Sequence, residues 1–367
     1  MRMSPLEHGV IGFATLAVVL MLVLWIGRDT QRFRHAVGFV VVATFCLVVL
    51  GAFVRLSDAG LGCPDWPGCY GGLSPLHSYD AIAEQQQLDP TGPVSHAKAW
   101  KEMVHRYLAS FVGACTLGFA IAAVRNRRRW QRSAWLAIGL FLVTCLQGAF
   151  GAWTVTLQLR PVIVTGHLIG GFLTLSLLLL LWMSTRPTRG GGSMFGSRSR
   201  PGTGLRWFAA IALIVVIVQI LLGGWVSTNY AALACPDFPT CQGQLVPSLD
   251  FTDGYDLGRE LGKTSSGEPL PASALATIHW MHRVFALVVA LIVGLLAWRL
   301  RALEETRRLA IGLGVVLALQ LVLGVSNVVF QLPLDVSVAH NGGAALLLLT
   351  LIVVNHRLTR CASSSLS

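Results

Sequence analysis

Nine long apolar runs dominate this chain and fix its fold class. They lie near residues 8–26, 36–56, 102–124, 134–155, 162–184, 207–228, 275–298, 309–330 and 336–356. A helix rises about 1.5 Å per residue, so about 20 apolar residues can cross a bilayer. Of the 367 residues, 54% are hydrophobic and only 12% are charged, against about 25% in soluble domains. The chain is therefore predicted to be an all-α polytopic membrane protein.

The basic residues behind the net charge of +11 gather in alternate loops between these runs. One such loop is RNRRRWQR, residues 125–132. Cytoplasmic loops carry the excess of Lys and Arg, so these loops are assigned to the inside and the N-terminus to the outside. The clusters lack the interleaved aromatic residues that stack on bases, so membrane lipid, and not nucleic acid, is the expected partner.

A repeated segment divides the chain into two halves. Residues 51–71, GAFVRLSDAGLGCPDWPGCYG, recur without gaps as residues 223–243, GGWVSTNYAALACPDFPTCQG. Each copy ends an apolar run and opens a long outer loop. Four runs then remain in each half, and an even number gives parallel repeats related by a pseudo-two-fold axis along the membrane normal. Two tandem four-helix bundles are the expected architecture.

The predicted boundaries follow from this repeat. They are 1–35 for an extra N-terminal transmembrane helix and basic loop, 36–186 for the first half, 187–206 for a Gly-, Ser- and Arg-rich cytoplasmic linker, 207–357 for the second half and 358–367 for a cytoplasmic tail. The first run could instead be a signal peptide. A retained helix is favoured because no A-x-A-like cleavage site follows it.

Four histidines lie inside apolar runs at repeat-equivalent positions. His105 corresponds to His282, and His167 to His340, because residues 146–167 align with 319–340. An ionisable residue inside a membrane is costly and is a functional candidate by default. Two neutral imidazoles on facing helices are a common way to hold haem iron. Each half could thus hold one porphyrin between its second and fourth helices, although hydrogen-bonded packing histidines or zinc ligands remain alternatives.

Charged residues near these histidines differ between the halves. Arg106 and Arg283 follow the first histidine of each pair and could bind haem propionates, or extend to the membrane interface. Arg55 is a weaker propionate candidate because the repeat has Ser227 there. Glu102 lies one helical turn before His105 and has no acidic counterpart. It suggests chemistry in the first half and electron storage in the second, unless it is an interfacial Glu just outside the bilayer.

Two C-x5-C pairs lie in the outer loops of the repeat: Cys63 with Cys69, and Cys235 with Cys241. An oxidising compartment favours a disulfide within each loop. A redox-active dithiol or a metal site is the alternative.

From about residue 36 to 357 the chain resembles haem A synthase, the membrane enzyme that converts haem O to haem A for cytochrome oxidase. The resemblance rests on VRLSDAGLGCPDWPGCYG (54–71), AWKEMVHRYLA (99–109), TGHLIGG (165–171), ACPDFPTC (234–241), IHWMHR (278–283) and AHNGG (339–343). It implies eight core helices in two halves and a location in a bacterial inner membrane. The extra N-terminal helix departs from that pattern.

The resemblance also implies roles for individual residues. His282 and His340 are expected to hold a haem b cofactor, and His105 and His167 to hold the haem O substrate. Glu102 becomes a candidate catalytic residue, and the pair Cys63 and Cys69 gains a functional role. A haem O synthase and cytochrome oxidase assembly factors are the implied partners. The electron donor, the oxygen source and a homo-oligomeric state stay open.

Two other classes of function compete with this enzyme. A two-haem membrane cytochrome that carries electrons from quinol would use the same histidines, but it leaves Glu102 unexplained. A transporter with parallel repeats would need a site near the membrane midplane, whereas all four histidines are expected in the outer half.

Overall fold

A computed structural model describes residues 29–128, 130–185 and 202–363, together with Val19, Val23 and 25–27. These residues form ten α-helices and no strand. The helices are α2 (Thr30–Leu56), α3 (Tyr79–Leu88), α4 (His96–Arg125), α5 (Gln131–Thr156), α6 (Pro161–Ser184), α7 (Thr203–Thr228), α8 (Phe251–Gly254), α9 (Ala272–Arg301), α10 (Arg307–Val329) and α11 (Leu334–Ser363). Short 3-10 turns lie at Ala231–Leu233 and Glu304–Thr306.

Eight of the described helices are long and apolar enough to cross a membrane, namely all except α3 and α8. The prediction of an all-α polytopic membrane protein is thereby confirmed. Most of the predicted first run (8–26), most of the predicted linker (187–206) and the end of the tail (358–367) lie outside the described residues.

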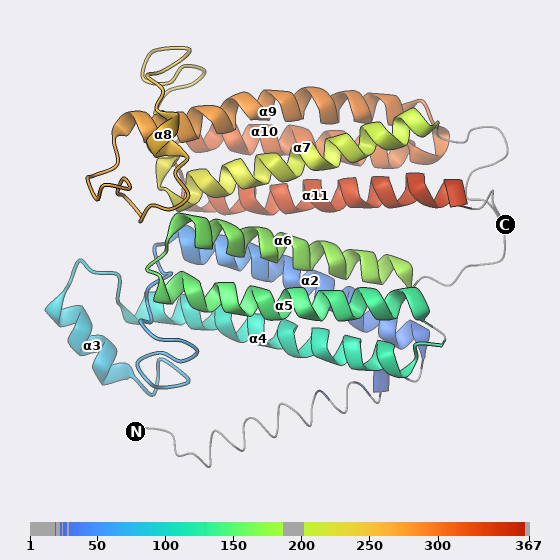
Figure 1. The fold of residues 1–367 in the computed structure, drawn as a ribbon, viewed down its shortest axis with the longest axis horizontal. Coiled ribbons are helices and arrows are strands. Elements are labelled where there is room, and N and C mark those ends of the chain that lie inside the picture. Colours follow the sequence, from blue (N-terminus) through green and yellow to red (C-terminus); the bar gives the residue numbers. More distant parts are fainter. Residues whose placement is uncertain are drawn as a thin grey trace. The chain divides into compact units, whose positions relative to one another are not determined.

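The chain divides into two compact units between residues 186 and 187. In the first unit α2 packs on α4 and α6, and α5 packs on the same two helices, so the four form a closed ring. Figure 1 shows these helices side by side, with α3 and the long loop after α2 at one end of the bundle. The second and fourth helices, α4 and α6, therefore occupy opposite corners.

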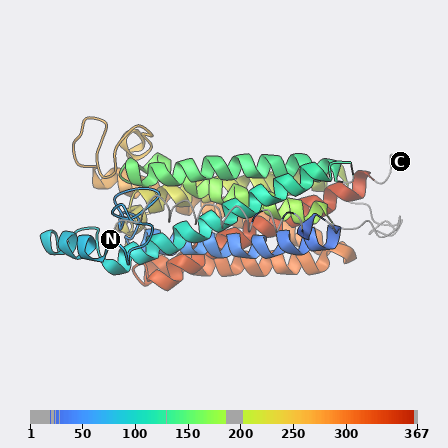
Figure 2. The same ribbon diagram turned by 90° about the horizontal axis from the view of Figure 1, so that it is seen from below.

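The second unit has the same order of packing. Helix α7 contacts α9 and α11, and α10 contacts the same two helices. Its long loop, which contains α8, lies at one end of its own bundle (Figure 1). The long helices lie alongside one another in both views (Figures 1 and 2). The pseudo-two-fold axis between the halves stays a prediction.

The helices that carry the first histidine of each pair, α4 and α9, begin earlier than the apolar runs that predicted them. Helix α4 begins at His96, where the Ser95 hydroxyl caps it by accepting a hydrogen bond from the Lys98 amide at 3.2 Å. Helix α9 begins at Ala272. His105 lies nine residues after the first residue of α4 (105 − 96), because the helix continues into the polar loop beyond the apolar run.

Apolar side chains pack densely at both ends of the first bundle. At the end opposite the cysteine loop, Phe33, Phe119, Leu140 and Leu181 form one buried cluster. Val19, Val23 and Ile26, from the predicted first run, are buried in the same cluster. A second cluster under the cysteine loop contains Cys63, Cys69, Ile82, Val94, Ala99 and Met103. On α4, His105 lies between Met103 of the second cluster and Val112 of the first.

Candidate functional site

The cysteine loop of the first half is built around the carboxylate of Asp65. This carboxylate accepts hydrogen bonds from the backbone amides of Tyr70 at 2.6 Å and Gly71 at 2.8 Å. Both residues have positive φ, 51° and 74°, and they form the turn of a small hairpin in which Cys69 and Gly72 exchange backbone hydrogen bonds. Glycine at position 71 removes the steric cost of that conformation. The repeated Asp and Gly of the motif thus shape the loop.

The second half builds its loop in the same way. Asp237 accepts from the amides of Gln242 at 2.7 Å and Gly243 at 3.0 Å. Thr240 adds a hydrogen bond from its hydroxyl, and this bond, followed by the amides, lowers the pKa of Asp237 to about 2. The carboxylate is therefore ionised at every physiological pH.

The predicted pairings of the loop cysteines are present in the structure. Cys63 is bonded to Cys69, and Cys235 to Cys241, each across a sequence separation of 6. All four residues are buried. The prediction of one disulfide in each loop is confirmed, and a redox role for either disulfide stays a prediction.

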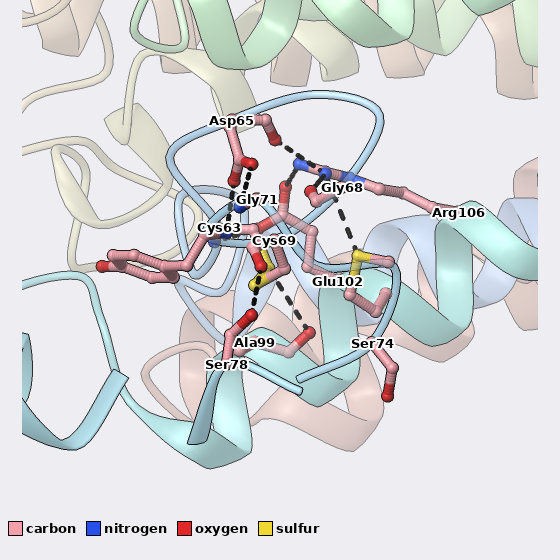
Figure 3. The surroundings of a disulfide bond; sticks show 12 residues. Cys63, Asp65, Gly68, Cys69, Gly71, Ser74, Ser78, Ala99, Glu102 and Arg106 are labelled. Atoms are coloured by element: carbon pink, nitrogen blue, oxygen red, sulfur yellow. Dashed lines mark hydrogen bonds and ion pairs between the residues drawn. A yellow bond between two sulfur atoms is a disulfide. The ribbon is translucent and has the colours of Figure 1, made fainter. Parts of the chain in front are cut away.

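Arg106 and Arg283 tie these loops to the helices beneath them. Arg106 donates to the backbone oxygens of Asp65 at 2.8 Å and Gly68 at 2.5 Å (Figure 3). Arg283 donates to the backbone oxygens of Asp237, Thr240 and Cys235 at 2.8, 2.9 and 2.6 Å. Sequence reasoning missed this tethering role, because the partners lie about 40 residues away in the chain. A contact with haem propionates stays a prediction for both.

Glu102 lies under the first loop and is 5% exposed. One carboxylate oxygen accepts a hydrogen bond from the backbone amide of Cys63 at 2.9 Å, and the other pairs with Arg106. Figure 3 shows this carboxylate beside the disulfide. Glu102 is therefore a fixed, buried carboxyl group with a cationic partner. Its position relative to the membrane interface stays a prediction.

In the second half, a neutral histidine stands at the position of Glu102 and contacts the arginine. His279 is also 5% exposed, and its Nε2 accepts a hydrogen bond from the Arg283 Nε at 3.1 Å. The arginine here takes the backbone oxygen of Cys235 as its third loop partner. The two loops are thus held by similar tethers, but only the first places a carboxylate beneath its disulfide.

His105 and His167 come together inside the first bundle. Their ring centroids are 6.5 Å apart, with an angle of 70° between the ring planes. Protein atoms cover each ring only in part, and both Nδ1 atoms are buried without a hydrogen-bond partner among the described residues. Two imidazoles on opposite helices therefore face one another across the interior of the bundle, as the sequence predicted.

His282 and His340 hold the corresponding places in the second bundle, on α9 and α11. Two glutamine side chains approach them: the Gln219 Nε2 lies 3.1 Å from the His282 Nδ1, and the Gln320 Nε2 lies 3.4 Å from the His340 Nε2.

Sequence reasoning did not assign these glutamines a place at the site. Gln147, which aligns with Gln320, donates to the backbone oxygen of His167 at 2.6 Å. Gln219 donates to the backbone oxygen of His282 at 3.1 Å, and the repeat places Leu47 at its position in the first half. The halves therefore differ a second time, because the first histidine of the pair has a glutamine neighbour in the second half, where the first half has a leucine. Comparing α2 with its repeat counterpart α7 could have revealed this difference.

Arg55 stands at the end of α2 and pairs with Asp58 at 3.6 Å. Its propionate role stays a prediction. In the long loop between α7 and α9, Arg259, 2% exposed, donates to the side-chain oxygen of Asn229 and to the backbone oxygen of Asp253. Tyr255, in the same loop, stacks on Trp225 of α7, and burial raises the pKa of Tyr255 to about 12.

The fold and the site define a class: a polytopic helical membrane protein with a pair of histidines inside each of two four-helix bundles. The chain belongs to the cytochrome oxidase assembly protein family, whose model matches residues 34–352.

Individual relatives share most of their length with this chain. It is similar to the Heme A synthase of Shewanella oneidensis, with 41% identity over 324 residues that cover 88% of this chain and 96% of that protein. The Heme A synthase of Caulobacter vibrioides is 29% identical over 84% of this chain and 91% of its own length. That of Rhizobium johnstonii is 28% identical over 86% and 87%.

Proposed function

We propose that this protein is a haem A synthase, which oxidises a methyl group of haem O to the formyl group of haem A. The observation that carries the proposal is the first bundle, where paired imidazoles lie on the helices next to a buried carboxylate that the second bundle lacks. The relative with 41% identity is named Heme A synthase, and this name supports the same activity.

The separation of His105 and His167 fits two axial ligands of one iron. An imidazole nitrogen lies about 2 Å from a bound metal, and the ring centroid lies about 1.1 Å further, so two axial rings have centroids about 6.2 Å apart. The observed 6.5 Å agrees with this value. The unpartnered Nδ1 atoms can carry the proton that leaves Nε2 free to bind iron. The substrate haem O is therefore assigned to His105 and His167.

The resident cofactor is assigned to the second bundle. His282 and His340 would hold a haem b there, which when bound accepts and passes single electrons. His282 has a polar neighbour in Gln219, and partners of this kind orient a metal-binding imidazole. His340 has a similar neighbour in Gln320.

Glu102 is the residue that we assign to the chemistry. Two successive hydroxylations of the methyl carbon, followed by loss of water from the geminal diol, give the formyl group. Each hydroxylation is a two-electron oxidation of the carbon, which requires either dioxygen with an electron donor, or water with an acceptor that takes up the two electrons. A carboxylate fixed by Cys63 and Arg106 can stabilise positive charge that develops at the carbon, and it can accept a proton released there. His279 offers no such negative charge in the second half.

The surroundings proposed for this enzyme follow from the same family. The distribution of basic residues places the cysteine loops on the outer face of a bacterial inner membrane. A haem O synthase supplies the substrate, and oxidase assembly factors receive the product. Electrons pass between the second-half haem b and a donor or acceptor whose identity we do not assign.

Acid extraction and chromatography of porphyrins from the purified protein tests the proposal. The protein is to be made in cells that also produce haem O. We expect haem b together with haem O, haem A or a hydroxylated intermediate. Haem b alone in a protein that converts no added haem O would overturn the enzyme and favour a membrane cytochrome.

A matched pair of carboxylate variants tests Glu102. Glu102→Gln should keep its bound porphyrins and lose haem A production, because the amide keeps the size of the side chain but not its charge. Glu84→Gln changes an exposed residue of α3 and should behave as the wild type. Normal haem A output from Glu102→Gln would remove this residue from the mechanism.

A further inference from the structure

Each of the four histidines packs the same edge of its ring against a glycine of a neighbouring helix. We propose that these glycines are positioning residues, which fix the rotation of the four imidazoles and thereby the orientation of the axial ligands. The pairs are Gly51 with His105, Gly151 with His167, Gly223 with His282, and Gly324 with His340. The inference rests on the proposed function and deepens it.

The contacts leave no room for a side chain. A Cβ atom added to the glycine would meet the Cε1 atom of the ring at 3.0 Å for Gly51, 3.3 Å for Gly151, 2.9 Å for Gly223 and 3.1 Å for Gly324. Carbon atoms at optimal separation lie about 3.5 to 4.0 Å apart. In all four pairs the next nearest atom is the Nδ1 of the same ring. The glycine therefore touches the ring at the edge between its two nitrogens.

This edge determines how the ring can turn. The Cε1 atom lies between Nδ1 and Nε2, so a group that pushes on it must rotate the ring about its Cβ–Cγ axis or displace Nε2. Terminal torsions of this kind have broad minima, so packing has to fix them. The helix backbone at the glycine limits this rotation of the imidazole, because it has no side chain that could move aside.

The recurrence of the contact argues against chance packing. Gly51 and Gly223 are the first residues of the two copies of the repeat, and Gly151 aligns with Gly324. The four come from four different helices, α2, α5, α7 and α10, none of which carries one of the four histidines. Each axial histidine thus has one glycine helix beside it.

The same helices supply matched control residues. Gly148 lies one turn before Gly151 in α5, and Gly314 lies in α10 with Gly324. A Cβ atom at Gly148 or Gly314 would meet nothing within 4 Å. Alanine has a better helix propensity than glycine by about 1 kcal/mol, so these two substitutions should be neutral or stabilising.

The experiment compares Gly324→Ala with Gly314→Ala, and Gly151→Ala with Gly148→Ala, in the full-length protein purified with its porphyrins. The EPR signal of low-spin iron depends on the angle between the axial imidazole planes, so each histidine-facing variant should shift the signal of its own haem. We expect porphyrin retention during purification to fall about fivefold or more in these variants, and to stay unchanged in the controls.

Two results separate this inference from the function on which it rests. Wild-type signals and wild-type porphyrin content in both Gly324→Ala and Gly151→Ala would overturn the positioning role and leave the enzyme intact. A wild-type protein that contains no low-spin iron would overturn the proposed function itself. Gly151→Ala has the longest contact, so it keeps the test available if Gly324→Ala does not fold.

Discussion

Replacing Arg106 with alanine should release the first cysteine loop while the second stays closed. The side chain is 12% exposed and donates to the backbone oxygens of Asp65 and Gly68. Hydrogen bonds that involve a charged group contribute about 1.5–3 kcal/mol each. Losing two of them at the lower limit removes about 3 kcal/mol from the closed state, which corresponds to about 150-fold more open loop.

The open state can be measured by reduction of the disulfides. All four loop cysteines are buried, so a water-soluble phosphine reaches them only when a loop opens. The rate of reduction then follows the population of the open form, provided that closing is faster than the chemistry. Differential alkylation and mass mapping of each cysteine pair would give the two rates separately in one sample.

The second loop serves as an internal control. Arg106→Ala should speed reduction of Cys63–Cys69 about 150-fold and leave Cys235–Cys241 unchanged, and Arg283→Ala should do the reverse. Unchanged rates in both variants would refute the tethering role. Equal acceleration of both disulfides would also refute it, because that result indicates global unfolding and not local release.

Two further predictions concern the long loop between α7 and α9. Because the pKa of Asp237 falls from 3.8 to about 2 on folding, its ionised form stabilises the loop fully above pH 4, and this stabilisation is lost as the pH falls toward 2. Carbon-13 NMR of labelled Asp carboxyls should show that depressed value, and Thr240→Val should raise it. Arg259→Ala leaves the Asn229 oxygen without its donor, so limited proteolysis of this loop should accelerate about tenfold or more. The exposed Lys263→Ala is the control and should have no effect.

The sequence predicted the membrane helices well because the bilayer imposes a simple rule. A helix that crosses it must be apolar for about 20 residues, and each of the eight described spans meets that condition. Helix α3 has a polar sequence, YDAIAEQQQL, and was missed for that reason. The start of α4 was placed six residues too late (102 − 96), since its first turns lie in the polar loop where hydropathy gives no signal.

The site could be predicted as a set of residue types but not as a network. The four histidines were found because ionisable residues are rare inside apolar runs. The partners of Arg106 are backbone oxygens. Every residue has one, so the sequence does not indicate which of them accept hydrogen bonds from this arginine. The role of Asp65 was visible only as an identity between the two repeats. Gln219 was overlooked because a lone amide in an apolar helix resembles a packing residue, and only its nearness to His282 gives it a role.

The tether between Arg106 and the first loop has a consequence for the order in which this protein is made. The chain leaves the ribosome from its N-terminus, and Arg106 follows Cys69 by 37 residues (106 − 69). If the loop lies on the outer face, as proposed, it is translocated before the helix that holds it has been inserted. During that interval both thiols would be open to the oxidising machinery of that compartment. Docking of α4 then ends this period, after which the bond between them is shielded from reductants.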